Sequence, residues 1–128
     1  MNDELKEHHL DLEKRDLRKR TKSFALRIVR LYSSLPKTTE AQVLGKQILR
    51  SGTSVGAHYH EARRARSAAE FISKIEGGLQ ELEETVYWME LLVEAEIVKE
   101  IRLNNLLKEA EELTSIFVAS VKKVKKSR

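Results

Sequence analysis

Apolar residues recur at steps of three and four along most of the chain, which is the period of an amphipathic α-helix. The pattern predicts four helical segments, over about residues 4–35, 38–64, 67–96 and from 101 into a basic tail. The breaks near 36–38, 65–67 and 97–100 are short, and short connections place consecutive helices antiparallel. The sequence therefore predicts an all-α, antiparallel up-down-up-down four-helix bundle, with residues 1–128 as a single domain.

The first segment carries a seven-residue repeat of large apolar side chains at Leu10, Leu17, Phe24 and Leu31. Such a repeat forms a stripe on one helical face. Pro36 is expected to end the helix, because the residue before a proline disfavours the α conformation. The pattern leaves open whether residues 1–11 are frayed.

The second segment begins at residue 38 or 39, where Thr39 and Gln42 fit a capping box. Its middle, residues 51–57, has poor helix propensity and could form a loop. We favour a helix, because Gly52 and Gly56 are four residues apart and permit close backbone approach. Its apolar or small inner positions are Val43, Leu44, Ile48, Ser51, Val55, Tyr59 and Ala62.

The third segment has the clearest pattern and opens with a capping box at Ser67 and Glu70. A heptad seam runs through Ile72, Ile75, Leu79, Leu82, Val86, Met89 and Val93, flanked by Phe71, Gly78, Thr85 and Leu92. Gly77 and Gly78 cost helix stability, which suggests a tightly packed neighbour. The fourth segment repeats the pattern at Leu103, Leu106, Ala110, Leu113, Phe117, Val121 and Val124.

Composition narrows the class of protein. The chain has no Cys, which excludes a disulfide framework, a thiolate metal site and a catalytic thiol. No apolar run approaches the roughly 20 residues of a membrane span, and the acidic, polar start is unlike a secretory signal. We expect a soluble cytoplasmic protein without a membrane partner.

The net charge of +4 conceals a strong segregation of charge along the chain. Residues 14–30 hold eight basic residues and one acid, whereas residues 67–112 hold four basic residues and twelve acids. From residue 113 onwards there are five basic residues and no acid. The local electric fields are therefore stronger than the average charge implies.

Clustered cations are what phosphate binding needs, because counterion release drives affinity. The alternative is a solvated helix face, partly paired with the acidic third helix. Aromatic residues are few, so shape-based recognition of structured RNA suits the chain better than base stacking. The candidate nucleic-acid contacts are Arg15, Arg18, Lys19, Lys22, Arg63, Arg64, Lys122, Lys123, Lys125 and Lys126, the last four within the basic tail at 122–128.

Metal and catalytic chemistry find little support. Di-iron bundles use Glu-x-x-His pairs, but His58 and Glu61 occur in the reverse order and form the only such pair. We interpret Glu61 as a partly buried, hydrogen-bonded carboxylate. Phosphate-loop, dinucleotide and nucleophile-elbow motifs are missing. We therefore expect no catalytic residue, cofactor or metal site.

Polar residues at fixed spacing in the central two-thirds of the chain resemble a known family. The match runs through Gln47, Arg50, Ser51, Ser54, Val55, Gly56, Ala57, Glu61, Ala62, Arg63, Arg64, Ser67, Glu70, Phe71, Lys74, Glu81, Glu84, Tyr87 and Trp88. These positions are similar to the bacterial 23S ribosomal RNA intervening-sequence proteins. His58 departs from the pattern, because the family usually has Asn there.

The resemblance implies a left-handed antiparallel bundle that assembles as a homopentamer around a central channel, with no established enzyme activity. The family is also similar to the accessory variability proteins of diversity-generating retroelements, which are basic pentameric barrels that bind nucleic acid and a reverse transcriptase. Gln47, Arg50, His58, Glu61 and Glu81 are expected to make structural polar contacts rather than to catalyse a reaction.

The combined reading is a non-enzymatic, oligomeric bundle that binds nucleic acid, with RNA favoured over DNA, through basic surfaces. The alternative is a protein-interaction scaffold, such as an accessory subunit of a retroelement reverse transcriptase. In that case the basic residues would contact an acidic protein, or RNA only within the complex.

Overall fold

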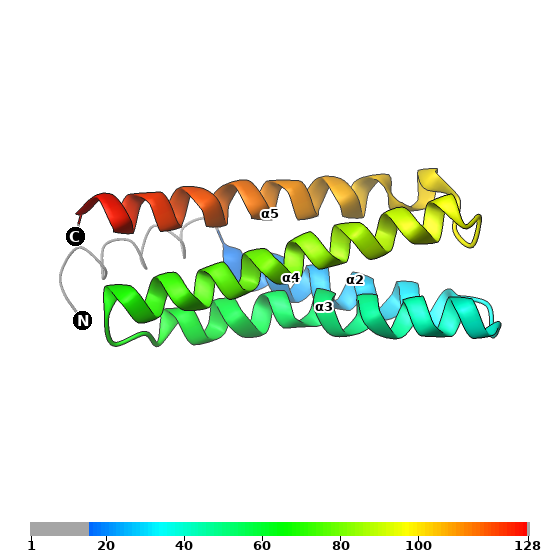
Figure 1. The fold of residues 1–128 in the computed structure, drawn as a ribbon, viewed down its shortest axis with the longest axis horizontal. Coiled ribbons are helices and arrows are strands. Elements are labelled where there is room, and N and C mark those ends of the chain that lie inside the picture. The colour runs from blue at the N-terminus through cyan, green and yellow to red at the C-terminus, as the bar shows by residue number, and fades with distance from the viewer. Residues whose placement is uncertain (1–15, 128) are drawn as a thin grey trace.

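The computed structural model describes residues 16–127, which form four helices running alternately up and down (Figure 1). The helices are α2 (Leu17–Ser34), α3 (Thr39–Arg63), α4 (Ala68–Glu94) and α5 (Glu100–Ser127). Residues 16–127 contain no β-strand. The predicted all-α, antiparallel up-down-up-down bundle is confirmed. The predictions at Leu10 and Arg15 lie outside the described residues.

The described part of the helix predicted over residues 4–35 begins at Leu17, directly after Asp16. The backbone of Asp16 is left-handed, with φ 58° and ψ 36°. Aspartate tolerates this conformation better than most residues, because its short side chain can bond locally. A uniform apolar repeat cannot reveal this left-handed residue, because the repeat records which face of a helix is apolar and not the backbone angles.

The turn between α2 and α3 confirms the predicted helix start, since α3 begins at Thr39, but corrects the predicted capping box. The side chain of Thr38, not Thr39, accepts a hydrogen bond from the Ala41 N–H at 3.4 Å. Gln42 does not close a capping box but donates its amide Nε2–H to the Pro36 carbonyl at 2.8 Å. Its amide oxygen accepts from the Tyr32 hydroxyl at 3.2 Å, so Gln42 fixes the turn against α2.

The cap predicted at the start of α4 is confirmed in its main bond. The Ser67 hydroxyl accepts from the Glu70 N–H at 3.1 Å. The Glu70 carboxylate accepts from the N–H of Arg66 rather than of Ser67, at 3.3 Å. The cap therefore satisfies one backbone donor of the helix and one of the preceding turn.

The middle of α3 is helical, as the spacing of its glycines predicted. A β-carbon on Gly52 would lie 2.7 Å from Ile28 on α2, and one on Gly56 would lie 3.3 Å from Thr21. These missing β-carbons let α2 approach α3 closely. The predicted inner position Val43 is wrong, because 56% of that residue is exposed to solvent.

Helix α4 is rotated relative to its predicted seam. The flanking series of Phe71, Gly78, Thr85 and Leu92 is fully buried. Leu79, Val86 and Val93 of the predicted seam are only partly buried, at the edge of the core. The centre of the buried face therefore lies on the flanking series, and part of the apolar stripe faces outward.

The core is closed by α5, whose predicted apolar positions are all buried. Phe117 fills the space above Gly78 and stacks on Tyr59 of α3, with ring centroids 6.3 Å apart. A buried hydrogen bond of 2.8 Å between the hydroxyls of Thr85 and Ser51 joins α4 to α3. By contrast, α2 contacts α5 much less than it contacts α3.

Candidate nucleic-acid interface

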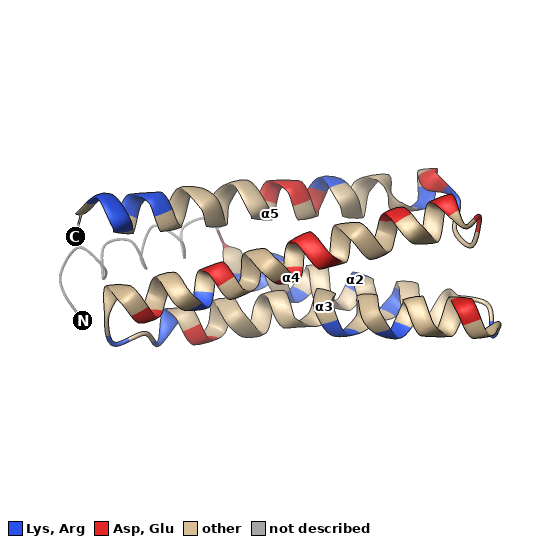
Figure 2. Cartoon of the chain, in the orientation of Figure 1, with Lys and Arg blue, Asp and Glu red and all other residues tan. Residues whose placement is uncertain are grey.

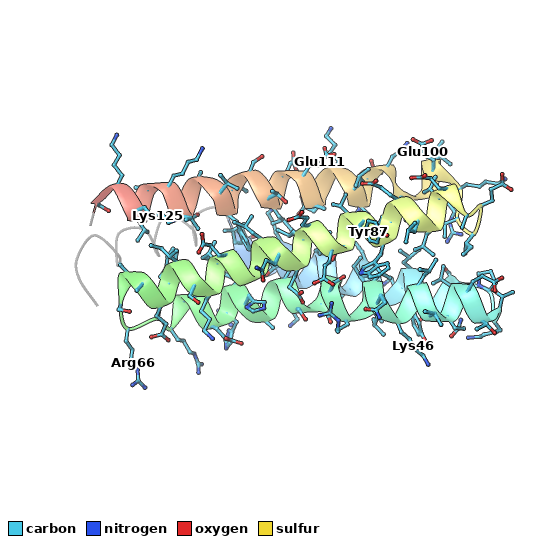
Figure 3. All side chains as sticks on the ribbon, viewed as in Figure 1. Lys46, Arg66, Tyr87, Glu100, Glu111 and Lys125 are labelled. Carbon is cyan, nitrogen blue, oxygen red and sulfur yellow. The ribbon has the colours of Figure 1, made fainter. Side chains whose placement is uncertain are left out.

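The antiparallel path brings three separate basic segments to one end of the bundle. The ends of α3 and α5 lie there, α2 begins on the same side of the bundle, and Figure 2 shows basic colour at that end of α5 and around the turn from α3 to α4. We call this set the basic end: Arg18, Lys19, Lys22, Arg63, Arg64, Lys122, Lys123, Lys125 and Lys126. In Figure 3, Arg66 and Lys125 lie at the opposite end of the molecule from Glu100.

Most cations of the basic end are free to meet a ligand. Seven of them are exposed and make no ion pair within residues 16–127: Arg18, Lys19, Lys22, Arg64, Lys122, Lys123 and Lys126. Lys125 lies 3.4 Å from the exposed carboxylate of Glu76, and Arg63 is half-buried. Clustered cations without acidic partners are suited to neutralise phosphate groups.

One cation of α2, Arg20, forms ion pairs, although the sequence pattern does not distinguish it from its basic neighbours. Arg20 donates hydrogen bonds to Glu109 of α5 through Nε at 3.0 Å and through Nη2 at 2.6 Å. Glu112 accepts a further bond from Arg20 at 3.0 Å. The hydrogen bonds from Arg20 hold the pKa of the Glu109 carboxyl below its ordinary value, although partial burial opposes the shift. The pairing thus runs to α5 and not to the acidic α4.

A shallow groove of about 320 Å³ between α2 and α3 adds two residues that the sequence reading did not select. Arg18 and Lys22 line one wall, and Thr53 and His60 line the other. Gly56, which has no side chain, lines the groove between these walls. His60 lies four residues before Arg64, so helical spacing could have placed both on one face.

Of the residues expected to make structural polar contacts, some pair with another helix and some do not. Arg50 joins α3 to α4, with Nη1 3.1 Å from the nearly buried Glu81 carboxylate and Nη2 2.6 Å from Glu84. Gln47 is exposed, and its side chain makes no hydrogen bond within the described part of the chain.

Glu61 is exposed rather than partly buried, and its carboxylate lies 2.7 Å from Nζ of Lys74. The hydrogen bond from Lys74, together with the positive charge of Lys74, lowers the pKa of Glu61. His58 packs its ring over Gly77, and its Nδ1 is buried without a hydrogen-bond partner in the described structure.

Two absences within residues 16–127 bear on other functions. These residues contain no group of three or more His, Cys, Asp or Glu side chains placed to hold a metal ion. No helix in this range is long and apolar enough to cross a membrane.

Comparison with known proteins gives a consistent result. Residues 13–119 match the 23S rRNA-intervening sequence protein family. The crystal structure of a protein of unknown function of the S23 ribosomal protein family, from Bacteroides thetaiotaomicron VPI-5482, superposes with a TM-score of 0.79 at 37% identity. The alignment covers 84% of this chain and 96% of that one. No curated protein matches the chain. The chain is therefore a member of the 23S rRNA-intervening sequence protein family.

Proposed function

We propose that the protein is a non-enzymatic nucleic-acid-binding bundle that contacts the phosphates of structured RNA through its basic end. The observation that carries the proposal is the convergence of three basic segments on one end, with seven exposed cations that make no ion pair within residues 16–127. Phosphate contact is the chemistry that such a surface serves best.

RNA is favoured over DNA for two reasons. Among residues 16–127 the exposed large aromatic side chain is Tyr87, which lies away from Arg66 and Lys125 in Figure 3, so recognition at the basic end would depend on backbone and shape. The family name refers to 23S rRNA-intervening sequences, which connects its members to ribosomal RNA. We further propose a cytoplasmic location and assembly as a homo-oligomer, with five copies as the family resemblance implies.

The test is fluorescence anisotropy of labelled structured RNA and duplex DNA across a salt series, using nuclease-treated protein. The triple variant Arg64→Glu, Lys122→Glu, Lys126→Glu replaces one unpaired cation near the end of α3 and two at the end of α5, and it leaves α2 unchanged. We expect it to lose at least tenfold in affinity and to flatten the slope of log affinity against log salt by about 2–3, since each phosphate contact contributes about one unit.

The matched control is Lys46→Glu, Lys99→Glu, Lys108→Glu. It changes the net charge equally at exposed positions away from the basic end. Equal losses in the two variants would reduce the effect to net charge and contradict a localised interface. If the wild-type protein binds neither nucleic acid at low salt, the proposal is wrong and the scaffold alternative, a subunit of a reverse transcriptase complex, takes its place.

A further inference from the structure

An apolar groove between α4 and α5 lies outside the basic end and has no role in the function proposed above. It measures about 790 Å³ and is open to solvent. Its apolar wall consists of Leu79, Val86 and Tyr87 of α4 together with Val118 of α5. Tyr87 is 55% exposed and Val118 is 36% exposed. Figure 3 shows Tyr87 near the middle of the bundle, away from both ends.

The groove carries an uncompensated negative charge. Glu83 and Glu90 of α4 and Glu111 of α5 line it, and no Lys or Arg does. All three carboxylates are exposed and make no ion pair within residues 16–127. The surface that fits this groove is therefore an apolar ridge with cations on both sides, because such a ridge buries the apolar wall and neutralises the acids.

The same chain presents such a ridge on the outer face of α2. Leu26 and Val29 are 46% and 40% exposed, although both are large and apolar. Lys22 and Arg30 stand on the same face, because positions four, seven and eight residues apart share one side of a helix. Both cations are exposed and unpaired among the described residues.

The two surfaces also match in length. Lys22 and Arg30 are separated by eight residues, or about 12 Å along α2. Glu83 and Glu90 are separated by seven residues, or about 10 Å along α4. A single exposed apolar side chain is ordinary on a protein surface. On α2, two apolar side chains lie between two cations. In the groove, apolar side chains lie between two acids at a similar spacing, so the two surfaces are complementary.

We propose that the outer face of α2 in one copy of the chain docks into the α4–α5 groove of the next copy. The contact joins two different surfaces, so it is heterologous, and repetition of one heterologous contact produces a ring when the rotation closes. The inference rests on the self-assembly proposed above, and it does not depend on nucleic-acid binding. Lys22 is the one residue that this contact shares with the basic end.

The test is the molar mass of nucleic-acid-free protein by sedimentation, over a concentration series up to about 100 µM. One double variant combines Lys22→Glu with Arg30→Glu, and the other combines Glu83→Lys with Glu90→Lys. Each double variant places like charges on both sides of the contact. Each should lower the mass to that of a monomer at concentrations where the wild type is assembled. All four positions are exposed, so both variants are expected to keep their helical circular dichroism.

Exchanging the charges of the α2 face and the α4–α5 groove is the decisive test. The quadruple variant with all four substitutions restores opposite charges and should recover assembly, and the two double variants should associate with each other when mixed although neither associates alone. Control variants Lys46→Glu, Lys108→Glu and Glu40→Lys, Glu96→Lys make the same charge changes outside both surfaces and should assemble normally.

Leu26→Asp tests the apolar part of the contact in the same assay and should also yield a monomer. A wild type that is monomeric at every concentration overturns the proposal. Double variants that assemble normally overturn it as well, and so does a failure of the exchanged charges to recover assembly. Loss of RNA binding by an assembled protein would contradict the proposed function alone.

Discussion

Single glycines set how closely neighbouring helices approach in this bundle. At Gly52 the nearest atoms belong to Ile28, which is fully buried and has a β-branched side chain with little rotational freedom. At Gly77 the nearest atoms belong to the His58 ring, which borders an open, polar groove. The same substitution should therefore have different consequences at the two sites.

We expect Gly52→Ala to lower the free energy of unfolding by about 1–2 kcal/mol. Overpacking a buried site costs about 1–3 kcal/mol, and alanine recovers up to about 1 kcal/mol of helix propensity. Gly77→Ala is the comparison, because the His58 ring can turn toward the groove. Urea unfolding of both variants measures the difference, and equal effects would show that the close contact with Ile28 is not decisive.

At the scale of elements, the contact between α2 and α5 depends on polar side chains more than the other helix contacts do. The two helices have little packed surface in common, and Arg20 of α2 meets Glu109 and Glu112 of α5. Hydrogen bonds between ionised groups are stronger than those between neutral groups. The Glu109 side chain is only 16% exposed, so solvent screens this pair less than a surface pair.

Glu109→Gln should lower the free energy of unfolding by about 1 kcal/mol at pH 7. The pKa of Glu109 is lowered in the folded protein, so its stabilising contribution is complete above the pKa of the unfolded chain. That contribution is lost as the pH falls through the lowered folded pKa. The difference between variant and wild type should therefore shrink on acidification, which urea unfolding at pH 7 and at lower pH measures.

Glu76→Gln is the matched control for this prediction. Glu76 and Lys125 also form an ion pair, but both side chains are about half exposed. Exposed pairs contribute little, so the change should stay below about 0.5 kcal/mol at either pH. An equal effect of the two substitutions would mean that burial does not distinguish the two pairs.

At the scale of the whole molecule, the basic end and the proposed assembly surfaces have only Lys22 in common. The basic end groups the start of α2, the turn from α3 to α4 and the end of α5, whereas the α4–α5 groove lies along the side of the bundle. A ring built through the groove would repeat the basic end once per subunit. Repeated weak contacts on one RNA then act together, and their avidity exceeds a single affinity.

Assembly should therefore raise the affinity for long RNA and leave the affinity for short RNA unchanged. We expect the monomeric Leu26→Asp variant to bind a long structured RNA about 100-fold more weakly than wild type at equal subunit concentration. A duplex too short to reach two basic ends should bind both proteins with similar affinity. Anisotropy with the two RNAs measures this, and a similar loss for both would indicate damage to the basic end itself.

The sequence by itself determined the helices, their order and the ends at which their termini lie. The apolar period sets helix length, and short connections force antiparallel neighbours, so the three basic segments had to meet at one end. Residues such as Arg18, Arg64 and Lys122 could therefore be selected as a common surface without knowledge of any contact. The close approach at Gly52 also followed from spacing alone.

Only the tertiary structure decided the rotation of α4 and the pairing of charges. A heptad pattern defines an apolar stripe, but the position of neighbouring helices decides which edge is covered, so Leu79 and Val86 face a groove instead of the core centre. Arg20 and Lys19 are adjacent in sequence, yet their directions differ by about 100° around the helix. That rotation carries Arg20 to Glu109, 89 residues away, and leaves Lys19 exposed to solvent.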